Sequence, residues 1–84
     1  MSYKVQISYA GAGSNGTGST YIGYINGRFA LQMDIEARDE RGELQTAARV
    51  MRRRFPVETD GLSRLTKAHE LADHDGRFAW RLAR

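Results

Sequence analysis

The stretch TYIGYINGRFALQMDI, residues 20–35, decides the fold of this chain. Two runs rich in apolar residues flank the Asn-Gly pair at 26–27, and Asn-Gly favours the two-residue type I′ turn of a β-hairpin. We therefore predict one strand over residues 21–25 and a second strand that begins at Arg28. In a two-residue hairpin, Ile25 pairs with Arg28 and sets the register of the following pairs.

This register predicts which residues share a face of the sheet, because side chains alternate between the two faces along a strand. The next pairs are Tyr24 with Phe29, Gly23 with Ala30 and Ile22 with Leu31. The predicted apolar face comprises Ile22, Tyr24, Phe29, Leu31, Met33 and Ile35. The predicted polar face comprises Tyr21, Gly23, Ile25, Arg28, Ala30, Gln32 and Asp34.

The residues before the hairpin predict a further strand and a loop. Apolar residues alternate with polar ones over positions 3–9, which is the period of a half-buried strand. Residues 11–19 are rich in Gly, Ser, Asn and Thr, so we expect them to form a mobile loop.

The residues after the hairpin predict two helices and a last strand. Beyond a charged turn at 38–42, apolar residues recur at helical spacing from Leu44 to Phe55, and Pro56 ends this helix. A shorter helix is predicted to start near Asp60 and to carry Leu62, Leu65, His69 and Ala72 on one side. Alternation of Phe78, Trp80 and Leu82 with polar or small residues predicts a terminal strand.

These elements predict one α+β domain over residues 1–84. The expected order is strand, strand, strand, helix, helix, strand, with a single antiparallel sheet of three to four strands and both helices on its apolar face. The opposite face is expected to be open to solvent.

Composition narrows the class of protein. The 84 residues contain no cysteine, which excludes disulfides and thiolate metal sites and suits a reducing compartment. The first residues alternate polar with apolar side chains and do not resemble a signal peptide, so we expect a cytoplasmic protein. The net charge is +3, and no acidic residue precedes Asp34.

A glycine pattern, Gly11-x-Gly13-x-x-Gly16, follows the first predicted strand and matches the G-x-G-x-x-G of phosphate-binding loops. A dinucleotide site needs a helix that opens at the third glycine, whereas a hairpin follows here. We therefore interpret the pattern as a connector and expect no cofactor.

The candidate binding residues are mostly arginines, whose planar guanidinium groups suit phosphate and carboxylate. One group lies at the end of the predicted helix, where cations also complement the helix dipole. On a helical wheel, Arg49 and Arg53 of this group point away from the predicted core. A second group lies on the predicted open face, which on this register is basic and lacks the several aromatic side chains on which single strands stack. The candidates for partner binding are Arg49, Arg52, Arg53, Arg28, Arg77, Arg81, Lys4 and Tyr21.

No catalytic or metal-binding residue is assigned. His69 and His74 have no obvious companion acid or base, and His74 with its neighbours Asp73 and Asp75 is a poor metal site because three consecutive residues do not converge easily.

We therefore expect a non-catalytic protein that occupies a surface of a nucleoprotein complex or nucleic acid through its arginines. By analogy of class, an inhibitor encoded by a phage or mobile element, of the anti-CRISPR type, fits this description. The alternatives are a small endoribonuclease toxin that uses His69 or His74 and a structural homodimer joined through a sheet edge. Either the helix or the open sheet face could form the interface.

Overall fold

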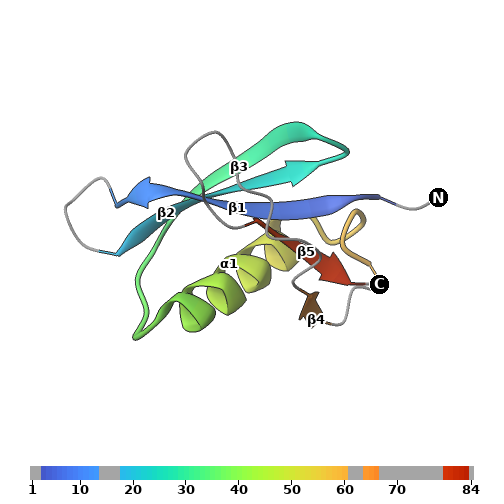
Figure 1. Ribbon diagram of the computed structural model, residues 1–84. Coiled ribbons are helices and arrows are strands. Elements are labelled where there is room, and N and C mark those ends of the chain that lie inside the picture. Colours follow the sequence, from blue (N-terminus) through green and yellow to red (C-terminus); the bar gives the residue numbers. More distant parts are fainter. Residues whose placement is uncertain (1–2, 14–17, 61–63, 67–78, 84) are drawn as a thin grey trace.

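A strongly curved antiparallel sheet packs on one long helix in the computed structural model of this protein (Figure 1). The structure describes residues 3–13, 18–60, 64–66 and 79–83, and for the last two ranges only the path of the backbone. The elements run in the order β1 (Val5–Ala12), β2 (Ser19–Ile25), β3 (Arg28–Ile35), α1 (Glu40–Arg54), β4 (Arg64–Thr66) and β5 (Ala79–Ala83). The sheet has the strand order β3-β2-β1-β5-β4, and all neighbouring strands are antiparallel. The α+β class and the antiparallel sheet are as predicted, but the sheet has five strands and not three to four, because β4 joins it.

The hairpin turn between β2 and β3 is confirmed. Asn26 and Gly27 have φ angles of 54° and 78°, the left-handed conformation that both central residues of a type I′ turn require. The turn is also tied to the start of β1, because the Lys4 N–H donates to Asn26 Oδ1 at 3.0 Å and the Asn26 N–H donates to the Lys4 carbonyl at 2.8 Å.

The register of β2 and β3 follows the prediction for two pairs and then departs from it. Ile25 pairs with Arg28 and Tyr24 with Phe29, but Gly23 pairs with Leu31. Ala30 is thus the extra residue of a β-bulge, and one extra residue moves every later side chain of β3 to the other face. Leu31, Met33 and Ile35 therefore lie on the helix side as predicted, whereas the predicted core residues Ile22, Tyr24 and Phe29 lie on the opposite face.

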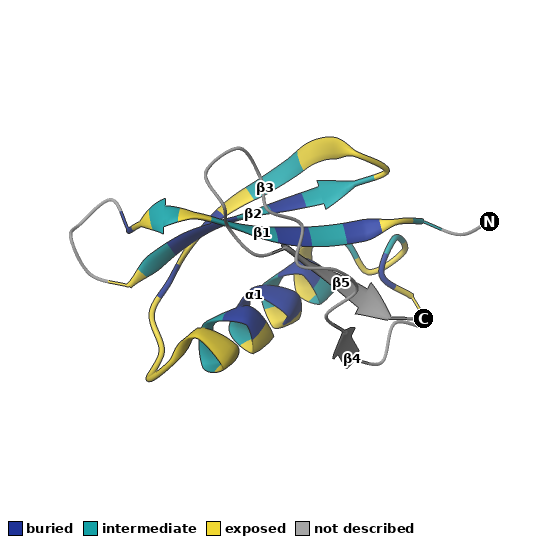
Figure 2. Ribbon diagram, viewed as in Figure 1, coloured by how far each residue is buried: buried dark blue, intermediate teal, exposed yellow. Residues whose placement is uncertain are grey.

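The core lies between α1 and the inward face of β1–β3 (Figure 2). Tyr21 and Ile7 are fully buried, although Tyr21 was predicted on the open face. A Cβ at Gly23 would lie against the Met51 Sδ of α1, so the absence of a side chain at Gly23 lets the helix approach β2 closely. The buried apolar residues are Val5, Ile7, Tyr21, Met33, Ile35, Leu44, Ala47, Ala48 and Met51.

The helix α1 begins inside the stretch predicted as a charged turn. The Asp39 carboxylate accepts from the Gly42 N–H at 2.7 Å, which caps the helix and allows it to start at Glu40. It ends at Arg54, immediately before Phe55 and Pro56, where the sequence predicted its end.

The second predicted helix is wrong where the structure describes it. Residues 64–66 form β4, which pairs with β5 from Arg64 with Ala83 to Thr66 with Arg81. Pairing with a strand distant in the sequence replaces the local helical hydrogen bonds in this segment. The rest of that predicted helix lies outside the described residues, whereas β5 matches the predicted terminal strand.

The loop predicted over residues 11–19 is shorter than expected. β1 extends through Ala12 and β2 starts at Ser19, and between them the Gly13 N–H donates to the Gly18 carbonyl at 3.2 Å. Positive φ angles at Gly11 and Gly18 allow this connection. Residues 14–17 lie outside the described part of the chain, and so does the third glycine of the glycine pattern.

Candidate binding surfaces

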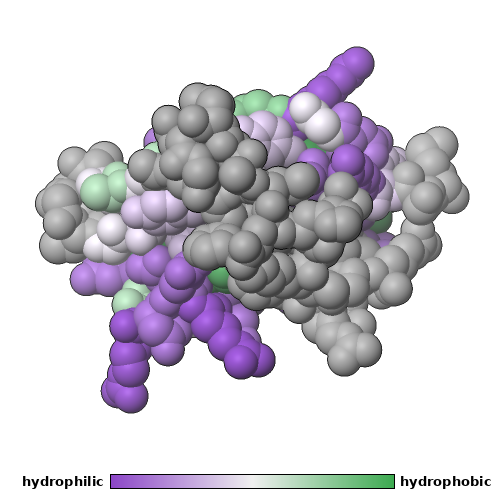
Figure 3. All heavy atoms as spheres, viewed as in Figure 1, coloured by the Kyte–Doolittle hydropathy of each residue, from purple (hydrophilic) through white to green (hydrophobic). Residues whose placement is uncertain are grey.

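Three exposed arginines and one exposed glutamine lie on successive turns of α1, outside its buried face. The N-terminal half of the helix contributes Arg41 and Gln45, and the C-terminal half contributes Arg49 and Arg53, all four of them exposed. They recur every four residues, so the row winds slowly around the helix: each step turns by about 40°, and Arg53 lies about 120° around the axis from Arg41. We call these four residues the arginine stripe. Figure 3 shows hydrophilic side chains projecting from the underside of the molecule, where α1 lies in Figure 1.

Acidic side chains of α1 are confined to its first turn. Glu40 and Glu43 lie there, whereas the last turn carries three arginines, so both ends complement the helix dipole. Glu43 also turns toward the sheet, where its Oε1 accepts from the Tyr21 hydroxyl at 3.0 Å. Between Glu43 and Glu58 the sequence has no acidic residue. The C-terminal half of the arginine stripe is therefore uniformly positive.

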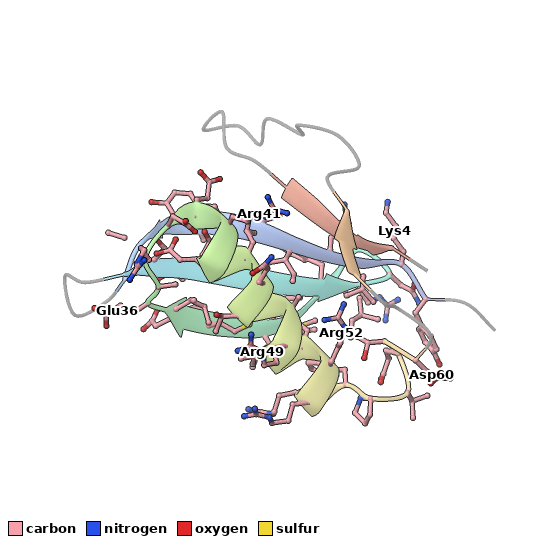
Figure 4. The ribbon with its side chains drawn as sticks, turned by 90° about the horizontal axis from the view of Figure 1, so that it is seen from below. Lys4, Glu36, Arg41, Arg49, Arg52 and Asp60 are labelled. Carbon is pink, nitrogen blue, oxygen red and sulfur yellow. The ribbon has the colours of Figure 1, made fainter. Side chains whose placement is uncertain are left out.

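The structure separates the helix arginines that the sequence grouped together. Arg49 and Arg53 are exposed, as their positions on the helical wheel indicated. Arg52 is half-buried and interacts with other groups of the protein, so it is less available to a partner. Figure 4 shows Arg41, Arg49 and Arg52 distributed along α1. The sequence prediction did not include Arg41 among the binding residues, because it placed a turn at the start of the helix.

Lys4 and Arg28, which the sequence placed together on the open sheet face, lie on opposite faces of the sheet. Lys4 is exposed and precedes the buried Val5, so it lies on the face away from α1. Arg28 is exposed but pairs with Ile25, which packs against the core, so Arg28 lies on the helix side of the sheet at its end. Arg81 pairs with Gln6 through the backbone of β5, and Arg77 lies outside the described residues.

Tyr21 is corrected from a binding residue to a core residue. It is fully buried, its ring makes an edge-on contact with Tyr9 at 5.5 Å between centroids, and its hydroxyl donates to Glu43. Burial, followed by the hydrogen bond and the negative charge of Glu43, raises the pKa of Tyr21 well above its ordinary value of 10.0. The hydroxyl therefore stays protonated in the folded protein.

This shift has a consequence for alkaline stability. In the unfolded chain Tyr21 loses its proton near pH 10, whereas in the folded protein it keeps it, so the free energy of unfolding falls as the pH rises above about 10 by up to about 1.4 kcal/mol per pH unit. Tyr21→Phe has no phenolic proton, so its free energy of unfolding should fall less steeply above about pH 10. Urea unfolding of both proteins between about pH 8 and about pH 11 measures the difference. Parallel stability curves would show that Tyr21 titrates normally in the fold.

A different set of side chains occupies the open face. With Val5, Ile7, Gly23 and Tyr21 turned toward α1, the intervening residues of β1 and β2 point away from it. Two rows run across β1, β2 and β3 on this open face: Gln6, Tyr24 and Phe29 in one, and Ser8, Ile22 and Gln32 in the next. The sequence prediction placed Ile22, Tyr24 and Phe29 in the core, because nothing in the local pattern indicates the bulge at Ala30.

No three His, Cys, Asp or Glu side chains of the described residues are placed to share a metal ion. Both histidines of the ribonuclease alternative lie outside that part. None of the helices in the described ranges has the length and apolarity that crossing a bilayer requires.

Comparison with known proteins gives no relative from which a function could be transferred: no family model, no curated protein and no solved structure matches this chain.

Proposed function

We propose that this protein is a non-catalytic binding protein that uses the arginine stripe of α1 to occupy an anionic surface of a nucleic acid or nucleoprotein complex. The observation that carries the proposal is the exposure of Arg41, Gln45, Arg49 and Arg53 on successive turns of one helix. Arginine forks match phosphate oxygens in pairs, and a helix holds them at fixed spacing.

The length of the stripe suits a polyanion. From Arg41 to Arg53 the helix rises by about 18 Å, and this length corresponds to about five phosphates of one DNA strand. Binding of this kind acts by steric occlusion or by competition for a nucleic-acid groove, which is how an inhibitor encoded by a phage or mobile element would work without an active site.

Charge reversal on the stripe tests the proposal. Arg49→Glu combined with Arg53→Glu should weaken binding of a fluorescein-labelled DNA duplex by about tenfold or more at about 50 mM salt, because two phosphate contacts become repulsive. The slope of log affinity against log salt should also become shallower by about two, since fewer counterions are released. Fluorescence anisotropy at several salt concentrations gives both quantities.

A matched variant controls for net charge. Arg28→Glu combined with Arg38→Glu makes the same change in charge at exposed positions outside the stripe. It should bind the duplex more tightly than the stripe variant and should fold equally well by circular dichroism. If the two variants lose affinity equally, the effect is one of overall charge and the stripe is not the interface.

A further inference from the structure

An aromatic pair lies on the open face, opposite the helix and its arginine stripe. Tyr24 and Phe29 are direct partners on β2 and β3, and paired residues of neighbouring strands place their side chains side by side on the same face. Tyr24 is half-buried, whereas 63% of the Phe29 side chain is exposed. Of the large apolar residues in the described part, only Phe29 and Val57 are so exposed.

The bulge is what brings Phe29 to this face. Phe29, Leu31, Met33 and Ile35 alternate in the sequence and would share the core face in a regular strand. The extra residue Ala30 turns Phe29 outward while the three later residues remain on the helix side. Bulges commonly redirect a side chain next to a functional site, and this bulge removes a phenylalanine from the core.

The surroundings of the aromatic pair are polar and positive. Gln6 is the β1 partner of Tyr24, and Gln32 lies exposed in the next row. Lys4 is exposed on the same face, one alternation before Gln6. The first acidic residue of the chain, Asp34, lies at the other end of β3, where it accepts from the Thr20 hydroxyl at 2.8 Å. The end of the face that carries the aromatic pair thus attracts anions.

We propose that this open face binds single-stranded nucleic acid, with bases stacked on Phe29 and Tyr24, base edges hydrogen-bonded by Gln6 and Gln32, and a phosphate near Lys4. Stacking accepts any base, and it requires bases that are free of a duplex. Asp34 lies at the far end of β3, so a phosphate backbone meets no carboxylate of the described strands beside the aromatic pair. The arginine stripe takes no part in this contact, so either proposal can fail without the other.

The test is binding of labelled single strands to Phe29→Ala. A mixed-sequence DNA strand and its RNA equivalent, each of about 12 nucleotides, should bind the wild-type protein more tightly than Phe29→Ala by about five- to a hundredfold. The salt dependence should be unchanged, because a neutral ring releases no counterions. The two strands distinguish DNA from RNA as the source of the bases.

Two control variants separate stacking from other effects. Phe29→Leu keeps an apolar side chain but has no aromatic face, so it should bind almost as weakly as Phe29→Ala, whereas Phe29→Tyr should bind like wild type. Arg49→Glu with Arg53→Glu reports on the arginine stripe and should retain the preference for a single strand over a duplex. Because Phe29 is exposed, these variants should fold, and circular dichroism checks that they do.

Three results would overturn the inference. One is equal affinity of Phe29→Ala and wild type for both strands. Another is wild-type affinity of Phe29→Leu for the single strands, which would mean that the contact is apolar and does not need an aromatic ring. A third is a wild-type dimer, seen by sedimentation, that dissociates in Phe29→Ala, since a second copy of the chain would then cover the face.

Discussion

Met51→Ala is expected to lower the free energy of unfolding by about 2–5 kcal/mol, which is the usual cost of truncating a buried methionine. Met51 is fully buried between α1 and the sheet, and the end of its side chain occupies the space above Gly23. Removing it leaves a cavity that the rigid hairpin and helix cannot readily close. Since a domain of this size has only about 4–13 kcal/mol of stability, the loss should shift urea unfolding strongly.

Val57→Ala is the matched control, because it also removes apolar carbons but from a side chain that is 70% exposed. It should change stability by less than about 0.5 kcal/mol. If both substitutions cost the same, Met51 does not fill the core as described.

The contact between Met51 and Gly23 should also appear as energetic coupling. Alone, Gly23→Ala places a Cβ against the Met51 Sδ and 2.6 Å from its Cε, which should cost about 1–3 kcal/mol through overpacking. In the Met51→Ala background the same Cβ enters the new cavity, so the cost should largely disappear. A double-mutant cycle by urea unfolding measures the coupling energy between positions 23 and 51, and additive effects would contradict the packing of α1 on β2.

Gly18→Ala is expected to be the most damaging glycine substitution, at about 2–4 kcal/mol. Gly18 has a φ of +66°, where an alanine is strained, and its Cβ would collide with the Ile35 carbonyl oxygen. That oxygen belongs to the backbone at the end of β3, beside the buried Ile35 side chain, so it cannot move aside as a flexible side chain would.

Gly27→Ala separates the backbone strain of a positive φ from the collision with the Ile35 carbonyl oxygen. Gly27 has a similar φ of +78°, but a Cβ there meets nothing within 4 Å. Its cost should be only the backbone strain, about 1–2 kcal/mol. Equal losses in the two variants, measured by urea unfolding, would show that the collision at Ile35 is relieved by a local shift.

The sequence by itself determined the features that depend on local chemistry. The Asn-Gly pair at 26–27 has the backbone freedom that the turn needs, and the structure shows both residues with positive φ. Helical spacing from Leu44 onward, followed by Pro56, predicted α1 and the exposure of Arg49 and Arg53. These inferences need only the conformational preferences of neighbouring residues, which are the same in any fold.

Only the tertiary structure decided which face of the hairpin became the core. A strand has a period of two, and the single extra residue Ala30 inverts the alternation within β3: Leu31, Met33 and Ile35 lie on the helix side, whereas Phe29 lies on the open face. Burial against α1 selects this register, because Gly23 leaves space for the Met51 side chain and the Tyr21 hydroxyl donates to Glu43 of the helix. Each of these two contacts joins residues more than twenty positions apart in the sequence, and no local pattern contains them. The same inversion removed Tyr21 from the predicted site and exposed Phe29, because the position of a side chain in a sheet depends on its distant neighbours.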